Sequence, residues 1–208
     1  MSSSRELHIF LNKAFKEVLE EIGFKKAPRE LLYYKEYNDG VQGFIGISSA
    51  ACGYTNVQFV NVMYAITNKN IQKQLFSLIE KKPHNGNMCN AMRGIYSLMP
   101  GKSYNDMVWK VENESEVFRV ARDAADYIKR IVFPVFETFN TWQKYKCGVM
   151  TGFLSTVNER NMIIPIIHYL EGDLSKGKQY IEDVLNRNPN AYNNSYDQVL
   201  FLQNYKKL

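Results

Sequence analysis

Apolar residues recur at intervals of three and four in two long stretches of the chain. The first stripe ends at Gly23 and contains Leu7, Leu11, Ala14, Phe15, Val18 and Ile22. The second begins at Glu114 and contains Val117, Ala121, Ala124, Ile128, Ile131, Val135 and Phe139. This spacing predicts two amphipathic helices. Ser3 and Glu6 have capping-box spacing at the start of the first, and Gly23 suits a left-handed cap at its end. Pro134 predicts a kink or an end in the second.

Between these helices the pattern changes to strands. Aromatic and apolar runs predict strands over residues 31–37, 41–48 and 57–66, with an Asn38-Asp39-Gly40 turn joining the first two. Gly43 and Gly46 predict a bulge or a close neighbour in the second strand. The third strand is apolar on both faces, which predicts a central position with neighbouring strands on both edges.

The next segments predict a helix, a hairpin and more helices. Asn68 begins a helix that should bury Ile71, Leu75, Leu78 and Ile79 and end at Pro83. Residues 88–99 and 107–111 are expected to form a second hairpin around a turn at residues 100–103. Residues 162–170 and 174–185 predict a helical hairpin around Gly172-Asp173, and a last short helix should begin at Ser195.

These elements predict an α+β fold. We expect an antiparallel sheet of about five strands, packed by the N-terminal helix and the long helix, with a C-terminal helical hairpin. Residues 1–140 should form the sheet domain and residues 141–208 a helical extension packed on it.

The order of elements resembles a bacterial domain-of-unknown-function family, number forty-three-oh-four, over residues 5–140. The similarity rests on Gly23-Phe24-Lys25-Lys26, Phe59-Val60-Asn61-Val62, Arg93-Gly94-Ile95, the Trp109 strand and Pro134. The chain departs from the family at Ile45-Gly46-Ile47-Ser48, where members often carry a glutamine, and at Val108-Trp109, where members often have paired tryptophans. The resemblance implies the fold and no reaction, and it implies an immunity-like role beside secreted toxins.

Residues 158–191 also resemble one tetratricopeptide unit. Gly172-Asp173, Gly177 and Asn188-Pro189 have the expected spacing, whereas Pro165 and His168 replace the usual glycine and tyrosine. Because such solenoids need about three repeats, a plain helical hairpin is the simpler interpretation.

Composition narrows the cellular setting and the partners. No apolar run approaches the roughly 20 residues that span a bilayer, and the N-terminus lacks a signal-peptide core. The three cysteines, Cys52, Cys89 and Cys147, are too widely spaced for a disulfide framework or a zinc site. We therefore expect a cytoplasmic protein. Its formal charge of +5 comes from scattered lysine pairs, which does not favour a nucleic-acid partner, and the oligomeric state is left open.

Candidate catalytic and metal-binding sets are incomplete. His168, Glu171 and Asp173 lack a second histidine, and Cys147 with His168 lacks an orienting third group. Asp123 and Asp126 lie four residues from arginines and predict a solvated ion-pair ladder. The Gly101-Lys102-Ser103 sequence lacks the rest of a phosphate loop. No cofactor or metal is expected.

The fourteen tyrosines are the unusual feature of the composition. Tyr, Trp and Arg are enriched among binding hot spots, which makes Arg93, Trp109, Tyr33 and Tyr37 the candidate partner-binding residues. Strand packing is the other explanation for the tyrosines. An internal ion pair with Glu112 is the other explanation for Arg93. The hypothesis from sequence is a non-catalytic protein-interaction protein, of the immunity-like class; the alternative is an enzyme or small-ligand binder with an unrecognised pocket.

Overall fold

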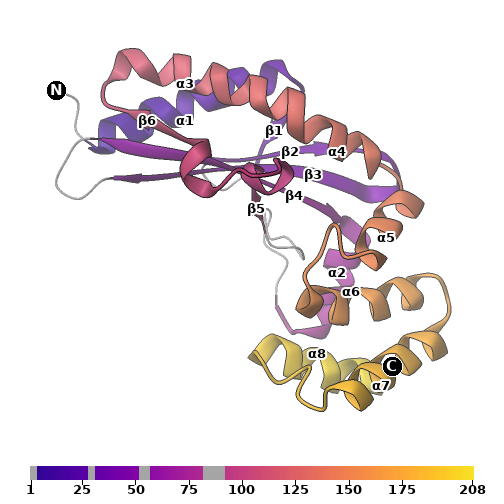
Figure 1. Cartoon of the computed structure of the whole chain (residues 1–208). Coiled ribbons are helices and arrows are strands. Elements are labelled where there is room, and N and C mark those ends of the chain that lie inside the picture. Colours follow the sequence, from indigo (N-terminus) through magenta and orange to yellow (C-terminus); the bar gives the residue numbers. More distant parts are fainter. Residues whose placement is uncertain (1–3, 28–30, 52–56, 82–91) are drawn as a thin grey trace. The chain divides into compact units, whose positions relative to one another are not determined.

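The computed structural model describes residues 4–27, 31–51, 57–81 and 92–208 and has the predicted α+β fold (Figure 1). The chain forms two compact units. The sheet unit comprises residues 1–36, 43–65 and 92–138. The helical unit comprises residues 37–42, 66–91 and 139–208. None of the helices in the described ranges combines the length and apolar composition needed to cross a membrane.

The first predicted helix is confirmed as α1, Ser4–Glu21. Its apolar stripe is buried from Leu7 to Val18, whereas Ile22 lies just beyond the helix and is half-buried. Gly23 has a φ of 88°, and the Phe24 N–H donates to the Leu19 carbonyl at 3.0 Å. These are features of a left-handed helix cap. Ser3 of the proposed capping box lies outside the described residues.

The sheet has the order β1-β2-β3-β4-β5, with β6 also paired to β4. The strands are β1 (Lys25–Lys26), β2 (Leu32–Glu36), β3 (Val41–Ala51), β4 (Gln58–Asn68), β5 (Arg93–Gly94) and β6 (Val108–Val111). Strand β4 has β3 on one edge and both β5 and β6 on the other, so its predicted central position is confirmed.

The predicted turn and glycine contacts are also present. Residues Asn38–Gly40 form a short 3-10 turn in which Asp39 and Gly40 have φ values of 55° and 76°. A side chain at Gly43 would lie 2.8 Å from the Phe136 ring, and one at Gly46 would lie 2.7 Å from Met92. Both glycines of β3 therefore mark close neighbours.

The second hairpin predicted from the sequence is wrong. Strands β5 and β6 pair with β4 and not with each other: β6 lies opposite Gln58–Asn61, and β5 opposite Met63 and Tyr64. The 3-10 helices Ile95–Leu98 and Tyr104–Met107 occupy the connection. The turn near Gly101 exists, but the long edge of β4 offers enough backbone groups to pair both short strands. Residues 88–91 lie outside the described ranges.

The long helix is interrupted at residues 128–132, and Pro134, where a kink or an end was predicted, lies in the first turn of the helix that follows. The long helix consists of α3 (Glu114–Tyr127), a π-helical segment (Ile128–Val132) and α4 (Phe133–Thr138). The wider π turn rotates the apolar face, so the buried residues after Ile128 are Val132 and Phe136. The predicted Ile131 and Val135 are only half-buried. Helices α1 and α3 lie side by side over one face of the sheet (Figure 1).

The helical unit contains the predicted hairpin. Its helices are α2 (Lys69–Leu78), α5 (Trp142–Met150), α6 (Val157–Leu170), α7 (Leu174–Arg187) and α8 (Tyr196–Lys207). Asn68 caps α2 as predicted, but α2 ends at Leu78, and Pro83 lies outside the described residues. Gly172, with φ of 81°, and Asp173, the N-cap of α7, form the turn between α6 and α7. Helix α2 packs on α6 and α8.

Candidate functional site

Two of the four residues predicted to bind a partner, Tyr33 and Tyr37, belong to different units. Tyr33 on β2 is 0% exposed, and its hydroxyl donates to the Asn12 carbonyl at 3.4 Å. Burial raises the pKa of this phenol well above its usual range. Tyr33 is therefore part of the core of the sheet unit. Tyr37 is half-buried and belongs to the helical unit, where its N–H donates to the Val41 carbonyl at 2.9 Å.

Arg93 and Trp109 do lie along the same edge of β4. Trp109 is opposite Val60 and Arg93 is opposite Tyr64, and residues four apart on a strand share a face. Trp109 is half-buried with its ring edge-on to Tyr127 at 5.7 Å between centroids. Arg93 is half-buried too and has interactions within the protein. Both side chains thus take part in internal packing.

The carboxylates considered as metal ligands are bonded to neighbouring cations. Glu171 accepts from Lys146 and, at 3.4 Å, from the Trp142 indole. The hydrogen bond from Lys146 is the main cause of its lowered pKa. Asp173 bonds Lys176 at the start of α7, which also lowers its pKa. Across the described ranges, no group of three or more His, Cys, Asp or Glu side chains is placed to hold a metal ion.

The remaining sequence candidates are the charged residues of α3 and the cysteines. Arg119 and Asp123 form the predicted ion pair at 3.3 Å, whereas Arg130 stacks on Tyr127 at 4.7 Å from the ring centroid. Cys147 is an exposed free thiol on α5; Cys52 and Cys89 lie outside the described residues.

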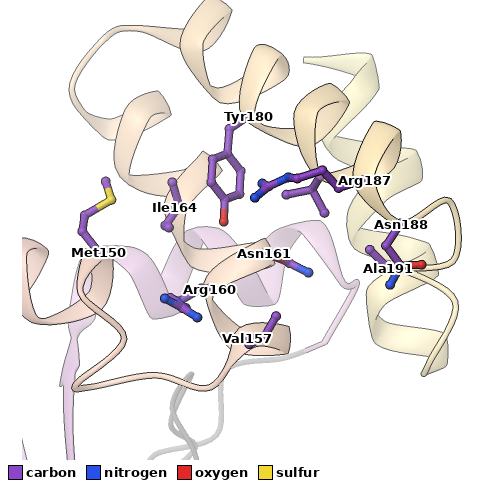
Figure 2. Close-up of a pocket in the computed structure, with 10 residues that line it drawn as sticks. Met150, Val157, Arg160, Asn161, Ile164, Tyr180, Arg187, Asn188 and Ala191 are labelled. Atoms are coloured by element: carbon purple, nitrogen blue, oxygen red, sulfur yellow. The ribbon is translucent and has the colours of Figure 1, made fainter.

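A better candidate is a groove of about 450 Å³ in the helical unit (Figure 2). We call it the α6–α7 groove and define it by its lining residues: Met150, Val157, Arg160, Asn161, Ile164, Tyr180, Val184, Arg187, Asn188 and Ala191. It is partly open to solvent. Its size falls in the range of known ligand sites, about 300–1,000 Å³.

Helical spacing explains why these side chains meet. The lining residues of α6 fall at positions i, i+3, i+4 and i+7 from Val157, and those at the end of α7 at i, i+4, i+7 and i+8 from Tyr180. Each set therefore lies on one face of its helix. Because α6 and α7 pack against each other as a hairpin, the two faces line one groove. Thr156 fixes the start of α6 with a capping box.

The groove is electropositive. It contains the guanidinium groups of Arg160 and Arg187 and no Asp or Glu among its described lining residues. Arg187 donates through Nε to the Asp183 carbonyl at 3.1 Å, a bond that leaves its charge uncompensated. Burial raises the pKa of Tyr180, and the charges of Arg160 and Arg187 oppose that rise. Both guanidiniums therefore act on this phenol, which stays protonated and can donate a hydrogen bond near neutral pH.

Two asparagines add further polar groups. Asn161 is only 6% exposed, and its backbone carbonyl accepts from the Tyr192 hydroxyl at 2.8 Å. Its side-chain amide makes no hydrogen bond to any residue that the structure describes. Asn188 Oδ1 accepts from the Asn190 N–H at 3.1 Å, which leaves its amide N–H groups available.

The lining residues can bind a ligand through hydrogen bonds, charge and apolar contact. They include no Ser, Thr, Cys, His, Asp or Glu, so they provide neither a nucleophile with a base nor a carboxylate pair. Ile164, Val184 and Ala191 are buried and form an apolar floor.

Sequence reasoning missed this groove. Arg160 and Arg187 lie on different helices, and neither has a motif around it. The available signal was the tetratricopeptide-like segment 158–191, which contains eight of the ten lining residues; Val157 borders it and Met150 precedes it. The groove has to be interpreted from its own residues, because no protein family, curated protein or solved structure matches this chain.

Proposed function

We propose that this protein is a non-catalytic interaction protein that binds a segment of a partner protein in the α6–α7 groove. The observation that carries the proposal is the pairing of two arginines with uncompensated charge and an apolar floor in one open groove. Aromatic and arginine side chains around an apolar centre are typical of protein-binding hot spots.

The dimensions of the groove favour an extended peptide. Its α6 wall runs from Val157 to Ile164, a rise of about 10 Å, which matches roughly three extended residues. A small-ligand enzyme, the alternative, would need reacting groups that the lining lacks. The open side of the groove leaves room for the rest of a bound chain.

The sheet-edge residues support this proposal less well. Tyr33 is enclosed, and Trp109 packs on Tyr127. A hot-spot side chain must gain contact on binding, and these rings already have most of theirs. We therefore propose the same interaction class as the sequence predicted, with the contact surface in the helical unit and not at the sheet edge.

The test is a display selection of random heptapeptides against the purified protein. Enriched peptides are then titrated by fluorescence anisotropy against the wild type and Tyr180→Ala. We expect Tyr180→Ala to weaken binding by about 2 kcal/mol, or roughly thirtyfold, as for a hot-spot residue.

The matched control is Tyr196→Ala. Tyr196 belongs to the same unit and is 75% exposed, but it does not line the α6–α7 groove. The Tyr196→Ala variant should bind every enriched peptide with the affinity of the wild type. Failure to enrich any peptide, or equal binding by Tyr180→Ala, would contradict the proposed function.

A further inference from the structure

We infer that the α6–α7 groove selects an acidic partner segment, in which a side-chain carboxylate meets Arg160 and Arg187 and a neighbouring apolar side chain covers Met150 and Val157. The inference rests on the proposed function and specifies the chemistry of its ligand. Three features of the groove support it: its charge, its hydrogen-bond donors and its apolar residues.

Charge is the first feature. Two guanidiniums line one groove that has no acidic residue among its described lining residues, and like charges repel. An anion between them would replace that repulsion by two attractions. Arginine binds carboxylates through parallel N–H donors, a geometry that lysine does not offer. The groove therefore matches a carboxylate in both charge and shape.

The neutral donors are the second feature. Figure 2 shows Tyr180 with its hydroxyl pointing into the space between the α6 and α7 side chains, and Arg187 extending toward it. A protonated phenol can donate to an anion but not to a cation. The Asn161 side-chain amide, which has no hydrogen bond to a described residue, offers N–H donors and a carbonyl acceptor, as a peptide backbone requires. These groups suit a peptide that carries a carboxylate.

The apolar floor is the third feature, and it separates the acidic peptide from other anions. Its residues Ile164, Val184 and Ala191 are only 4–5% exposed, so the apolar surface that a ligand can cover belongs to the neighbouring Met150 and Val157, which are 38% and 62% exposed. Inorganic phosphate would meet the arginines and leave Met150 and Val157 uncovered. The chain's own C-terminus is a poor occupant, because Lys206 and Lys207 precede Leu208 and would bring positive charge to a positive site.

Val157 offers a direct way to test the charge requirement. It borders the groove, is 62% exposed and is the first residue of α6. A glutamate is well tolerated at a helix N-terminus, and at this position it lies three residues from Arg160, within reach of its guanidinium. Val157→Glu would thus supply an internal carboxylate without disturbing the fold, and Val157→Gln is its uncharged control.

The experiment titrates isotope-labelled protein by NMR with acetyl-Ala-Leu-Glu-Leu-Ala-amide and its Gln counterpart. The Glu peptide should shift the amide resonances of Arg160, Asn161 and Tyr180 and bind about tenfold tighter than the Gln peptide at low salt. Arg160→Met, Arg187→Met and Val157→Glu should each remove most of this preference. Val157→Gln should keep it, as should Lys178→Met, a charge change on α7 outside the groove.

The outcomes separate the inference from the proposed function. Equal binding of the Glu and Gln peptides in the groove would overturn the acidic preference and leave the proposed function standing. Tighter binding of inorganic phosphate, or of a peptide whose only carboxylate is its C-terminus, would also overturn it. If neither these peptides nor the display-selected ones shift a groove resonance, both the inference and the proposed function fail.

Discussion

The sheet edge of one unit and the α6–α7 groove of the other contain the same kinds of side chain with opposite roles. At the edge of β4, Trp109 packs on Tyr127 and Arg93 interacts within the protein. In the groove, the Tyr180 hydroxyl and the Arg160 guanidinium have no hydrogen bond to a described residue. Residue type alone would rank the two regions equally. The contacts that each side chain already makes separate a packing role from a binding role.

The largest expected effect contrasts two tyrosines. Tyr33→Ala removes a fully buried ring from the sheet unit and should lower the free energy of unfolding by about 3–5 kcal/mol. Tyr180→Ala removes a half-buried ring that faces the groove and should cost only about 1 kcal/mol. Urea unfolding followed by circular dichroism measures both. Similar losses for the two variants would show that Tyr180 belongs to a core and not to a binding surface.

Glycines at close approaches provide the second contrast. A Cβ at Gly43 would meet the Phe136 ring at 2.8 Å, and one at Gly177 would meet the Tyr205 hydroxyl at 2.0 Å. Each Gly→Ala change should therefore destabilise the protein by about 1–3 kcal/mol through overpacking.

Peptide binding should distinguish the two glycine variants. The Tyr205 hydroxyl donates to the Pro165 carbonyl of α6 at 2.7 Å, so Gly177→Ala should displace α7 from α6 and weaken binding in the groove. Gly43→Ala acts on the sheet core and should bind peptide as the wild type does. Anisotropy titrations of the folded variants provide the measurement. Retained binding by Gly177→Ala would contradict a groove built by the α6–α7 packing.

Local sequence signals predicted most of the fold. The cap at Gly23, the Asp39-Gly40 turn and the two apolar faces of β4 each depend on neighbouring residues, and each was confirmed. The failures depend on distant partners. The β5–β6 hairpin was wrong because both strands pair with β4, and the stripe after Ile128 shifted because a π turn changed the helical period.

The candidate site was less predictable for the same reason. The charge of Arg187 becomes informative only when α6 and α7 pack and place it in the groove with Arg160 and Tyr180. Neither its spacing in the sequence nor its residue type indicates that packing. Conversely, Tyr33 had the residue type of a hot spot, and only its complete burial assigns it to the core.

Alkaline pH should weaken the helical unit through Tyr205. Burial is the main cause that raises the pKa of this phenol from 10.0 to about 12. Above pH 10 the unfolded chain loses this proton while the folded protein keeps it, so the folded state binds more protons and the free energy of unfolding falls as pH rises toward 12.

The loss should be on the order of 1 kcal/mol midway through that window. Urea unfolding at a series of pH values measures it, with Tyr205→Phe as the variant that lacks the titrating group. Tyr196→Phe, an exposed counterpart in α8, should keep the full pH dependence. An identical slope in Tyr205→Phe and the wild type would show that Tyr205 does not cause the effect.

The smallest effect concerns two arginines near solvent, one in each unit. Arg119 pairs with Asp123 at 3.3 Å, with side chains that are 59% and 48% exposed. Such a pair four residues apart on a helix contributes about 0.3–0.5 kcal/mol, and salt screens it. A double-mutant cycle of Arg119→Met and Asp123→Asn should give a coupling energy of this size that declines at high salt.

Arg187→Met should change stability just as little, since its charge has no carboxylate partner in the groove. Arg187→Met should nevertheless bind the Glu peptide more weakly than the wild type, whereas Arg119→Met should bind it with normal affinity. Loss of peptide binding in both variants would mean that general positive charge, and not the α6–α7 groove, attracts the ligand.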